Sequence, residues 1–408
     1  MPSTDSPTAR STQPGPVIRP FMPELDTLRG IAVVGVVLLH GIYSSYSGLS
    51  FGPIGRTIVT LTQPGWIGVN LFFVLSGFLI TGILLDSKKR PNYYRRFYTR
   101  RALRILPAYY LLLILLLLLR SSSAAFVGLS FVYLSNLTYF FGVPCDYGPL
   151  WSLAVEEHFY IAWPAVVRWM SMRRLALVSA CIVVGVPILR AVSFSLGLRT
   201  GLDWYTWFVA DGLAAGALLA ILLRTSITRR QLRGLCGLLL GSSALLALAG
   251  WPFGILSRNR LLGAGFQWTV LNLFFAGILL LFLLAGSGNA QRYVNLPVLR
   301  FLGYISYGLY LDHLLAFRLY DRLCRHYLPQ IMPSGGHFSL VLLRFSLAGS
   351  FAVAAAYLSR RFFEERFLRL KDSLGKDSPE PSSVTPQTMG PKSQPAVAFG
   401  SGSDTRIA

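Results

Sequence analysis

Ten apolar runs of roughly 18 to 22 residues constrain the fold of this chain more than any other feature. Such a run, folded as a helix, crosses a bilayer core of about 30 Å. Only 13% of the residues are charged, against about 25% in a typical soluble domain. We therefore predict an all-α membrane protein with about ten transmembrane helices. The expected spans cover residues 27–46, 66–86, 103–120, 151–170, 175–194, 204–223, 233–250, 267–286, 303–322 and 338–362.

The remaining segments set the expected boundaries of this membrane domain. An eleventh apolar stretch, 126–141, is short and contains Asn136, so we predict a re-entrant or interfacial segment shielded by protein. Residues 1–21 are rich in Pro, Ser and Thr, which predicts a disordered tail, and 371–408 are expected to form a second one. The membrane domain itself is expected over residues 22–370.

The basic residues are unevenly distributed among the predicted loops. The net charge is +21, and the densest basic segment runs from Lys88 to Arg104. The loops on the side of the two termini carry the excess of Lys and Arg, which predicts that both termini are cytoplasmic. The charges form no single stripe, so the sequence gives no reason to expect a nucleic-acid partner. The four cysteines lack metal-ligand spacing, and no metal site is expected.

Arg29 and His40 stand in the first expected span, eleven residues apart. Eleven residues are close to three full turns, so both side chains are predicted on one face, about 16 Å apart along the axis. Ionisable residues inside a membrane helix are costly and indicate a functional site. A histidine can exchange protons near neutral pH, which makes His40 a candidate catalytic base.

Arg101 and Arg104 precede the third span and share a helix face because they are three residues apart. Guanidinium groups bind phosphates bidentately, so the pair is a candidate site for a phosphorylated, aromatic-bearing cofactor such as a nucleotide. The alternative is a topological anchor that contacts lipid headgroups. In the preceding span, Gly68 and Gly77 belong to a row of small residues that permits close helix contacts.

The fourth span begins GPLWSLAVEEHFYIAWP and carries two adjacent carboxylates. Glu156 and Tyr160 share a face, whereas Glu157 is expected to point elsewhere. Counted from the expected outer end near Trp151, Glu156 lies one to two turns deep, in the same half of the membrane as His40. The alternative is that the carboxylates only pair with arginines of the outer loops.

The ninth span, LGYISYGLYLDHLLAF, places Tyr307 and His313 in the middle of the membrane. His313 is either a substrate contact or a core histidine that bonds to a tyrosine. We predict that Trp151, Tyr160, Tyr307 and His313 contact substrate.

Taken together and in this order, these strings resemble the acyltransferase 3 family of membrane acyltransferases. The resemblance rests on LDTLRGIAVVGVVLLH, GVNLFFVLSGFLIT, RRALRILP, LWSLAVEEHFYIAWP and SYGLYLDH, and covers about residues 22–370. It implies ten core helices, an acyl-CoA donor on the cytoplasmic side and a carbohydrate hydroxyl as acceptor. It also implies a bacterial inner (plasma) membrane.

On this resemblance we expect an integral-membrane O-acyltransferase acting on a surface polysaccharide, glycolipid or glycoside. Acetyl-CoA is the expected donor, held by Arg101 and Arg104, and no cofactor is permanently bound. His40 would act as base or as transient acyl carrier, Glu156 would orient the imidazole, and Arg29 would line the donor path or stabilise negative charge. The main alternative is a multi-span transporter or flippase of a glycan or lipid-linked sugar.

Overall fold

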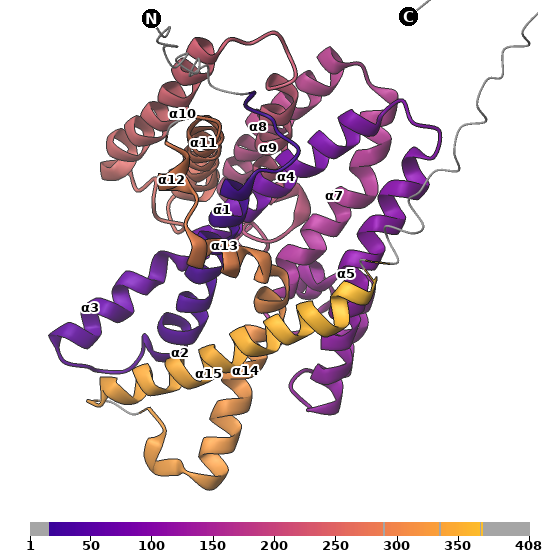
Figure 1. Ribbon diagram of the computed structural model, residues 1–408. Coiled ribbons are helices and arrows are strands. Elements are labelled where there is room, and N and C mark those ends of the chain that lie inside the picture. Colours follow the sequence, from indigo (N-terminus) through magenta and orange to yellow (C-terminus); the bar gives the residue numbers. More distant parts are fainter. Residues whose placement is uncertain (1–15, 289, 334–335, 368, 370–408) are drawn as a thin grey trace, which may run out of the picture.

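Every regular element in the described part of the chain is a helix (Figure 1). The computed structural model describes residues 16–288, 290–333, 336–367 and 369. The α-helices are α1 (Pro23–Leu38), α2 (Ser44–Tyr46), α3 (Pro53–Thr62), α4 (Ile67–Ser87), α5 (Tyr93–Leu118), α6 (Ala124–Phe131), α7 (Leu150–Trp169), α8 (Met172–Ser195), α9 (Thr206–Leu222), α10 (Arg229–Gly250), α11 (Leu261–Gly286), α12 (Gln291–Val294), α13 (Pro297–Tyr304), α14 (Ser306–Tyr327) and α15 (Phe338–Leu358). The 3-10 and π segments are η1 (Leu39–Tyr43), η2 (Gln63–Trp66), η3 (Ser135–Phe141), η4 (Trp251–Phe253), η5 (Pro329–Ile331) and η6 (Ser359–Glu364). The predicted tail 371–408 and most of the tail 1–21 lie outside the described residues.

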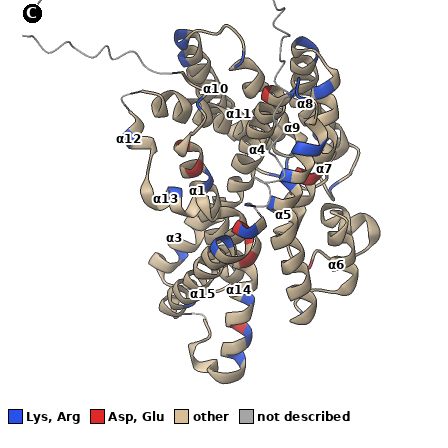
Figure 2. Ribbon diagram, turned by 45° about the vertical axis from the view of Figure 1, so that its right-hand side comes forward, with Lys and Arg blue, Asp and Glu red and all other residues tan. Residues whose placement is uncertain are grey.

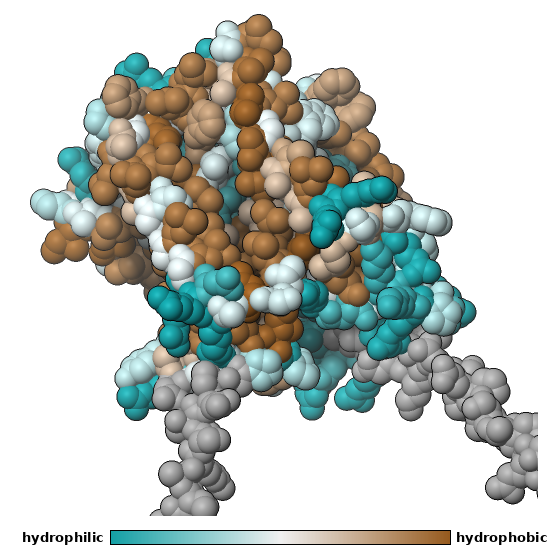
Figure 3. All heavy atoms as spheres, turned by 90° about the horizontal axis from the view of Figure 1, so that it is seen from above, coloured by the Kyte–Doolittle hydropathy of each residue, from teal (hydrophilic) through white to brown (hydrophobic). Residues whose placement is uncertain are grey.

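Each expected span coincides with a helix, and the prediction of an all-α membrane protein is confirmed. Figure 3 shows the apolar side chains that cover much of one face of the molecule. Seven helical segments in the described residues are long and apolar enough to cross a bilayer: Pro23–Tyr46, Pro53–Ser87, Tyr93–Leu118, Met172–Ser195, Arg229–Phe253, Leu261–Gly286 and Phe338–Phe367. The other three expected spans correspond to α7, α9 and α14, so the total of about ten spans stays a prediction.

The eleventh apolar stretch folds as α6 and the 3-10 segment η3. Asn136 is buried in η3 and its amide donates to the Thr206 hydroxyl at 3.0 Å. Phe140 and Phe141, at the end of the same segment, are exposed. One side of the segment thus packs on the protein, while its aromatic end faces outward.

Helix α1 lies at the centre of the molecule and packs against α4, α11, α13 and α14 (Figure 1). Helix α4 lies between α1 and α9, and glycines allow the close approach on both sides. A Cβ atom at Gly68 would lie 2.4 Å from the Ala32 carbonyl oxygen, and one at Gly77 would lie 1.9 Å from that of Leu213. The predicted role of these small residues in close helix packing is confirmed.

A buried ion pair joins α8 to α9. Arg190 and Asp211 are 0% and 1% exposed, and two parallel hydrogen bonds of 3.1 and 2.9 Å connect them. Arg190 also donates to the carbonyl oxygens of Gly265 and Phe208. Because its donors are satisfied within the protein, this charge is tolerated inside the helix bundle.

Candidate active site

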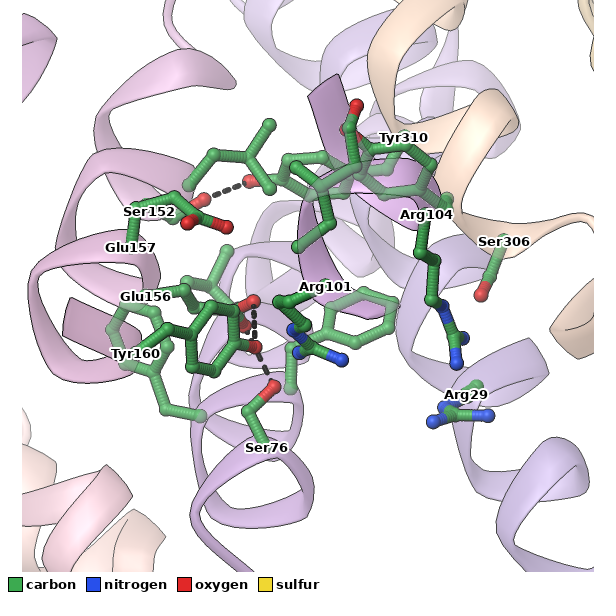
Figure 4. A pocket seen from close by; sticks show the side chains of 16 residues that line it. Arg29, Ser76, Arg101, Arg104, Ser152, Glu156, Glu157, Tyr160, Ser306 and Tyr310 are labelled. Carbon is green, nitrogen blue, oxygen red and sulfur yellow. Dashed lines mark hydrogen bonds between the residues drawn. The ribbon is translucent and has the colours of Figure 1, made fainter. Parts of the chain in front are cut away.

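A polar pocket, here called the arginine pocket, lies between α1, α4, α5, α7 and α14. Figure 2 shows basic and acidic positions near α5 and α7, inside a largely uncharged body. Figure 4 shows how their side chains converge. The lining residues are Arg29, Val69, Phe72, Phe73, Ser76, Arg101, Arg104, Ile105, Ser152, Leu153, Glu156, Glu157, Tyr160, Ser306, Tyr307 and Tyr310.

Glu156 is held in the arginine pocket by two hydroxyl groups. The Ser76 Oγ donates to Glu156 Oε1 at 2.9 Å, and the Tyr160 hydroxyl donates to Oε2 at 2.7 Å (Figure 4). The Arg101 guanidinium lies over the Tyr160 ring, 4.0 Å from its centroid. Both carboxylate oxygens are therefore satisfied, and a cation stands beside them.

The three arginines of this pocket differ in their partners. Arg29 forms an ion pair with Asp26 at 3.0 Å. Among the described residues, neither Arg101 nor Arg104 forms an ion pair with a carboxylate, and Arg104 is exposed in the pocket. Glu156 and Glu157 act electrostatically on Arg101, whereas Arg104 lies among like charges, so Arg104 is the guanidinium best suited to bind an added anion.

A second cavity, here called the basic groove, shares Arg101 and Arg104 with the arginine pocket. Tyr93 and Phe97 bring aromatic rings to this groove. It thus offers several guanidinium groups with aromatic surface between them. The other lining residues are Ile80, Ile83, Asp86, Ser87, Arg90, Arg96 and Arg100.

A third cavity, here called the histidine pocket, adjoins the arginine pocket. Val69 and Tyr310 line both the arginine pocket and the histidine pocket. At this junction the Tyr310 hydroxyl lies 2.6 Å from Ser152 Oγ. The histidine pocket is lined by Val36, Leu39, His40, Trp66, Val69, Ser135, Asn136, Thr138, Tyr139, Cys145, Gly148, Pro149, Trp151, Asp203, Trp204, Arg258, Trp268 and Tyr310.

His40 lies in the π-helical segment η1, which directly continues α1. A π turn contains more residues than an α turn and often occurs at functional sites. The His40 Nδ1 atom lies 3.0 Å from Nε2 of His313 on α14. His313 is fully buried, and its own Nδ1 lies 2.9 Å from the Leu309 carbonyl oxygen.

The structure thus distributes the predicted site residues between two pockets. Six of them line the arginine pocket and two line the histidine pocket. His313 lines neither pocket and contacts His40. The six are Arg29, Arg101, Arg104, Glu156, Tyr160 and Tyr307, and the two are His40 and Trp151.

Two expectations about the carboxylates are wrong. Glu156 bonds to Ser76 and Tyr160 in the arginine pocket and does not orient His40. Because α5 begins at Tyr93, Arg101 lies about 12 Å along the helix rather than at its mouth, at the level of Tyr160, which bonds to Glu156. Glu157 does not point elsewhere but also lines the arginine pocket.

Sequence reasoning missed the C-terminal contribution near this site. Arg360 and Glu364, in the π segment η6, form an ion pair at 3.3 Å. Segment η6 packs against α5, the helix that carries Arg104 (Figure 1). The i,i+4 spacing of Arg360 and Glu364 was the available signal.

Comparisons with known proteins show sequence similarity to acyltransferases. The acyltransferase 3 family model, described as an acyltransferase domain, matches residues 22–361. The peptidoglycan O-acetyltransferase OatA of Listeria monocytogenes is 29% identical over 333 residues, covering 72% of this chain and 49% of that protein. The putative peptidoglycan O-acetyltransferase YrhL of Bacillus subtilis is 35% identical over 201 residues, covering 43% and 29%.

The matched regions are shorter than these relatives. The O-acetyltransferase OatA of Staphylococcus aureus is 30% identical over 178 residues, which are 38% of this chain and 26% of that protein. The chain therefore spans about half the length of the curated relatives, or less. No solved structure matches. Because the family model covers most of the sequence, the chain belongs to the acyltransferase 3 family, and its long apolar helices make it a multi-pass membrane protein.

Proposed function

We propose that this protein is an O-acyltransferase that moves an acyl group, most simply acetyl, from cytoplasmic acyl-CoA to a carbohydrate hydroxyl. We place it in the bacterial inner membrane, with both termini in the cytoplasm. One observation carries the proposal: a pocket rich in arginine adjoins a pocket that contains His40, and Tyr310 lines both. A donor and an acceptor bound in these two pockets would meet at Tyr310.

The basic groove and the arginine pocket suit the donor. Acyl-CoA carries several phosphate charges on a nucleotide, followed by a thin thioester arm. The basic groove offers guanidinium groups and the rings of Tyr93 and Phe97. Arg101 and Arg104 then continue the cationic lining into the arginine pocket. The thioester would reach the junction, where the Tyr310 hydroxyl can donate to its oxygen as negative charge develops.

The histidine pocket suits a carbohydrate acceptor. The rings of Trp66, Tyr139, Trp151 and Trp204 provide flat apolar surface for a sugar. Asn136 and Asp203 provide polar groups, and the Asn136 Oδ1 has no hydrogen-bond partner among the described residues. Two of the relatives carry peptidoglycan in their names, one of them as a putative enzyme, and the strands of peptidoglycan are carbohydrate.

In this proposal His40 acts as general base. It removes the proton from the acceptor hydroxyl while the oxygen attacks the acyl carbon. The new C–O ester bond forms, the C–S bond breaks, and the proton passes to the leaving thiolate of CoA. A positioned proton-transfer group of this kind contributes about 10²–10⁴ in rate.

The experiment uses the full chain in sealed proteoliposomes with one orientation. Acetyl-CoA and a membrane-impermeant chitooligosaccharide are supplied on chosen sides, and free CoA and acetylated sugar are quantified. We expect one CoA released per acetyl group transferred, with acetyl-CoA accepted only on the Lys88–Arg104 side and the sugar only on the other. Sugar movement without CoA release would indicate the transporter alternative. Modification of sugar supplied on the donor side would contradict transfer across the membrane.

A further inference from the structure

The contact between His40 and His313 joins two side chains that are 273 residues apart in the chain. It joins η1, the continuation of the central helix α1, to α14, which packs beside both segments (Figure 1). The histidine rings also overlap, with centroids 5.1 Å apart and an angle of 28° between planes. His313 lines neither pocket, so it would not touch donor or acceptor.

The Leu309 carbonyl oxygen determines which nitrogen atoms of the two histidines carry protons. The Leu309 carbonyl oxygen can only accept, so the His313 Nδ1 atom at 2.9 Å must carry a proton. His313 is fully buried, and among the described residues no carboxylate bonds to it, so a charged ring there would be an unpaired buried cation. The neutral ring with its proton on Nδ1 leaves Nε2 as an acceptor.

The same reasoning then assigns the proton of the neutral His40 ring to one nitrogen. Its Nδ1 atom lies 3.0 Å from the accepting Nε2 of His313 and must therefore donate. In a neutral imidazole the other nitrogen then carries a lone pair. The His40 ring also makes a hydrogen bond to the Val36 backbone, whose carbonyl oxygen can only accept, and His40 lines the histidine pocket.

We infer that His313 is a positioning residue that fixes the tautomer of His40, so that the His40 Nε2 lone pair faces the acceptor. The inference rests on the proposed function, in which His40 removes the acceptor proton. His313 performs the role that a carboxylate performs in catalytic triads: it accepts from the base and holds it in the productive tautomer. A neutral acceptor suits this site because a carboxylate here would need its own buried counter-charge.

Two substitutions of similar size separate positioning from packing. In His313→Asn the amide oxygen can accept from His40 Nδ1, whereas the leucine side chain of His313→Leu offers no acceptor. We expect His313→Leu to lower kcat by about 10²–10⁴-fold, with the KM for acetyl-CoA within about threefold of wild type. His313→Asn should recover at least tenfold of the lost kcat. Equal kcat in the two variants, or a loss confined to KM, would overturn the inference.

A measurement without turnover keeps the inference testable if His313→Leu fails to fold and separates it from failure of the proposed function. The protein labelled with ¹⁵N-histidine, in nanodiscs, has five histidines, and the His40 signals are identified by their loss in His40→Asn. We expect the His40 Nδ1 to be protonated and Nε2 unprotonated in the wild type. A proton on Nε2 would overturn the inference even if acyl transfer is observed.

Discussion

The clearest test of the donor site is the replacement of Arg104 by alanine. Arg104 is exposed in the arginine pocket and also lines the basic groove, and it forms no ion pair among the described residues. Its removal should leave the folded protein intact, because the nearby Glu364 keeps its ion pair with Arg360.

The magnitude follows from the contact that Arg104 would make with a donor phosphate. A hydrogen bond to a charged group contributes about 1.5–3 kcal/mol. Since about 1.4 kcal/mol corresponds to a factor of ten, the affinity for acyl-CoA should fall roughly 10- to 150-fold. The change should appear in KM and in the dissociation constant of CoA, with kcat within about threefold. Arg104→Lys should recover part of the affinity, because lysine keeps the charge but lacks the planar fork.

The assay measures KM for acetyl-CoA and calorimetric binding of CoA in nanodiscs, at several salt concentrations. The matched control is Arg95→Ala on the same helix, since Arg95 is exposed and lines neither cavity. Wild-type KM should rise with salt, and more steeply than that of Arg104→Ala. Unchanged KM and CoA binding in Arg104→Ala would refute the donor assignment and leave this arginine a topological anchor.

Three further predictions address other parts of the structure. Asp211→Ala leaves Arg190 buried without its counter-charge and should destabilise the protein by about 3–5 kcal/mol in unfolding measurements. The double variant Asp211→Leu with Arg190→Met should recover most of that loss, and equal stability of all forms would contradict the buried pair. Tyr310→Phe removes the hydroxyl at the junction of the two pockets and should lower kcat by about 10²-fold with little change in donor KM, so an unchanged kcat would exclude this hydroxyl from the reaction. Burial and the neighbouring Asp146 raise the pKa of the Cys145 thiol, so maleimide labelling should be slow at neutral pH and accelerate as the pH rises. Because Cys145 lines the histidine pocket, the label should block the acceptor and inhibit transfer, and maleimide inhibition that persists in Cys145→Ala would contradict this.

Hydropathy and short motifs predicted the parts of this protein that depend on local sequence. The apolar runs predicted the helices, because a chain in lipid must satisfy its backbone hydrogen bonds within each segment. The row of small residues in α4 predicted the close helix contacts at Gly68 and Gly77. Residues singled out by their charge inside apolar helices, such as Arg29, Arg101 and Glu156, line one pocket.

The features that could not be predicted from the sequence depend on contacts between distant segments and on the rotation of each helix about its axis. The pairing of His40 with His313 requires knowing that α14 packs against η1. The π turn at Leu39–Tyr43 changes the direction of side chains after α1, and no residue type there signals it. Glu156 was expected beside His40 because its depth in the membrane was counted from assumed helix ends. Helix α5 starts ten residues before the predicted span, which places Arg101 beside Tyr160, the partner of Glu156.

The central claim is that His40 performs proton transfer at the junction of a donor pocket and an acceptor pocket. Its most direct measurement compares acetyl transfer by purified wild type, His40→Ala and His326→Ala in the same nanodiscs. His326 is exposed and lines neither pocket, so it is the matched control. The account predicts a loss of about 10²–10⁴-fold in kcat for His40→Ala, with CoA binding retained, and wild-type activity for His326→Ala. Wild-type rates in His40→Ala would contradict it.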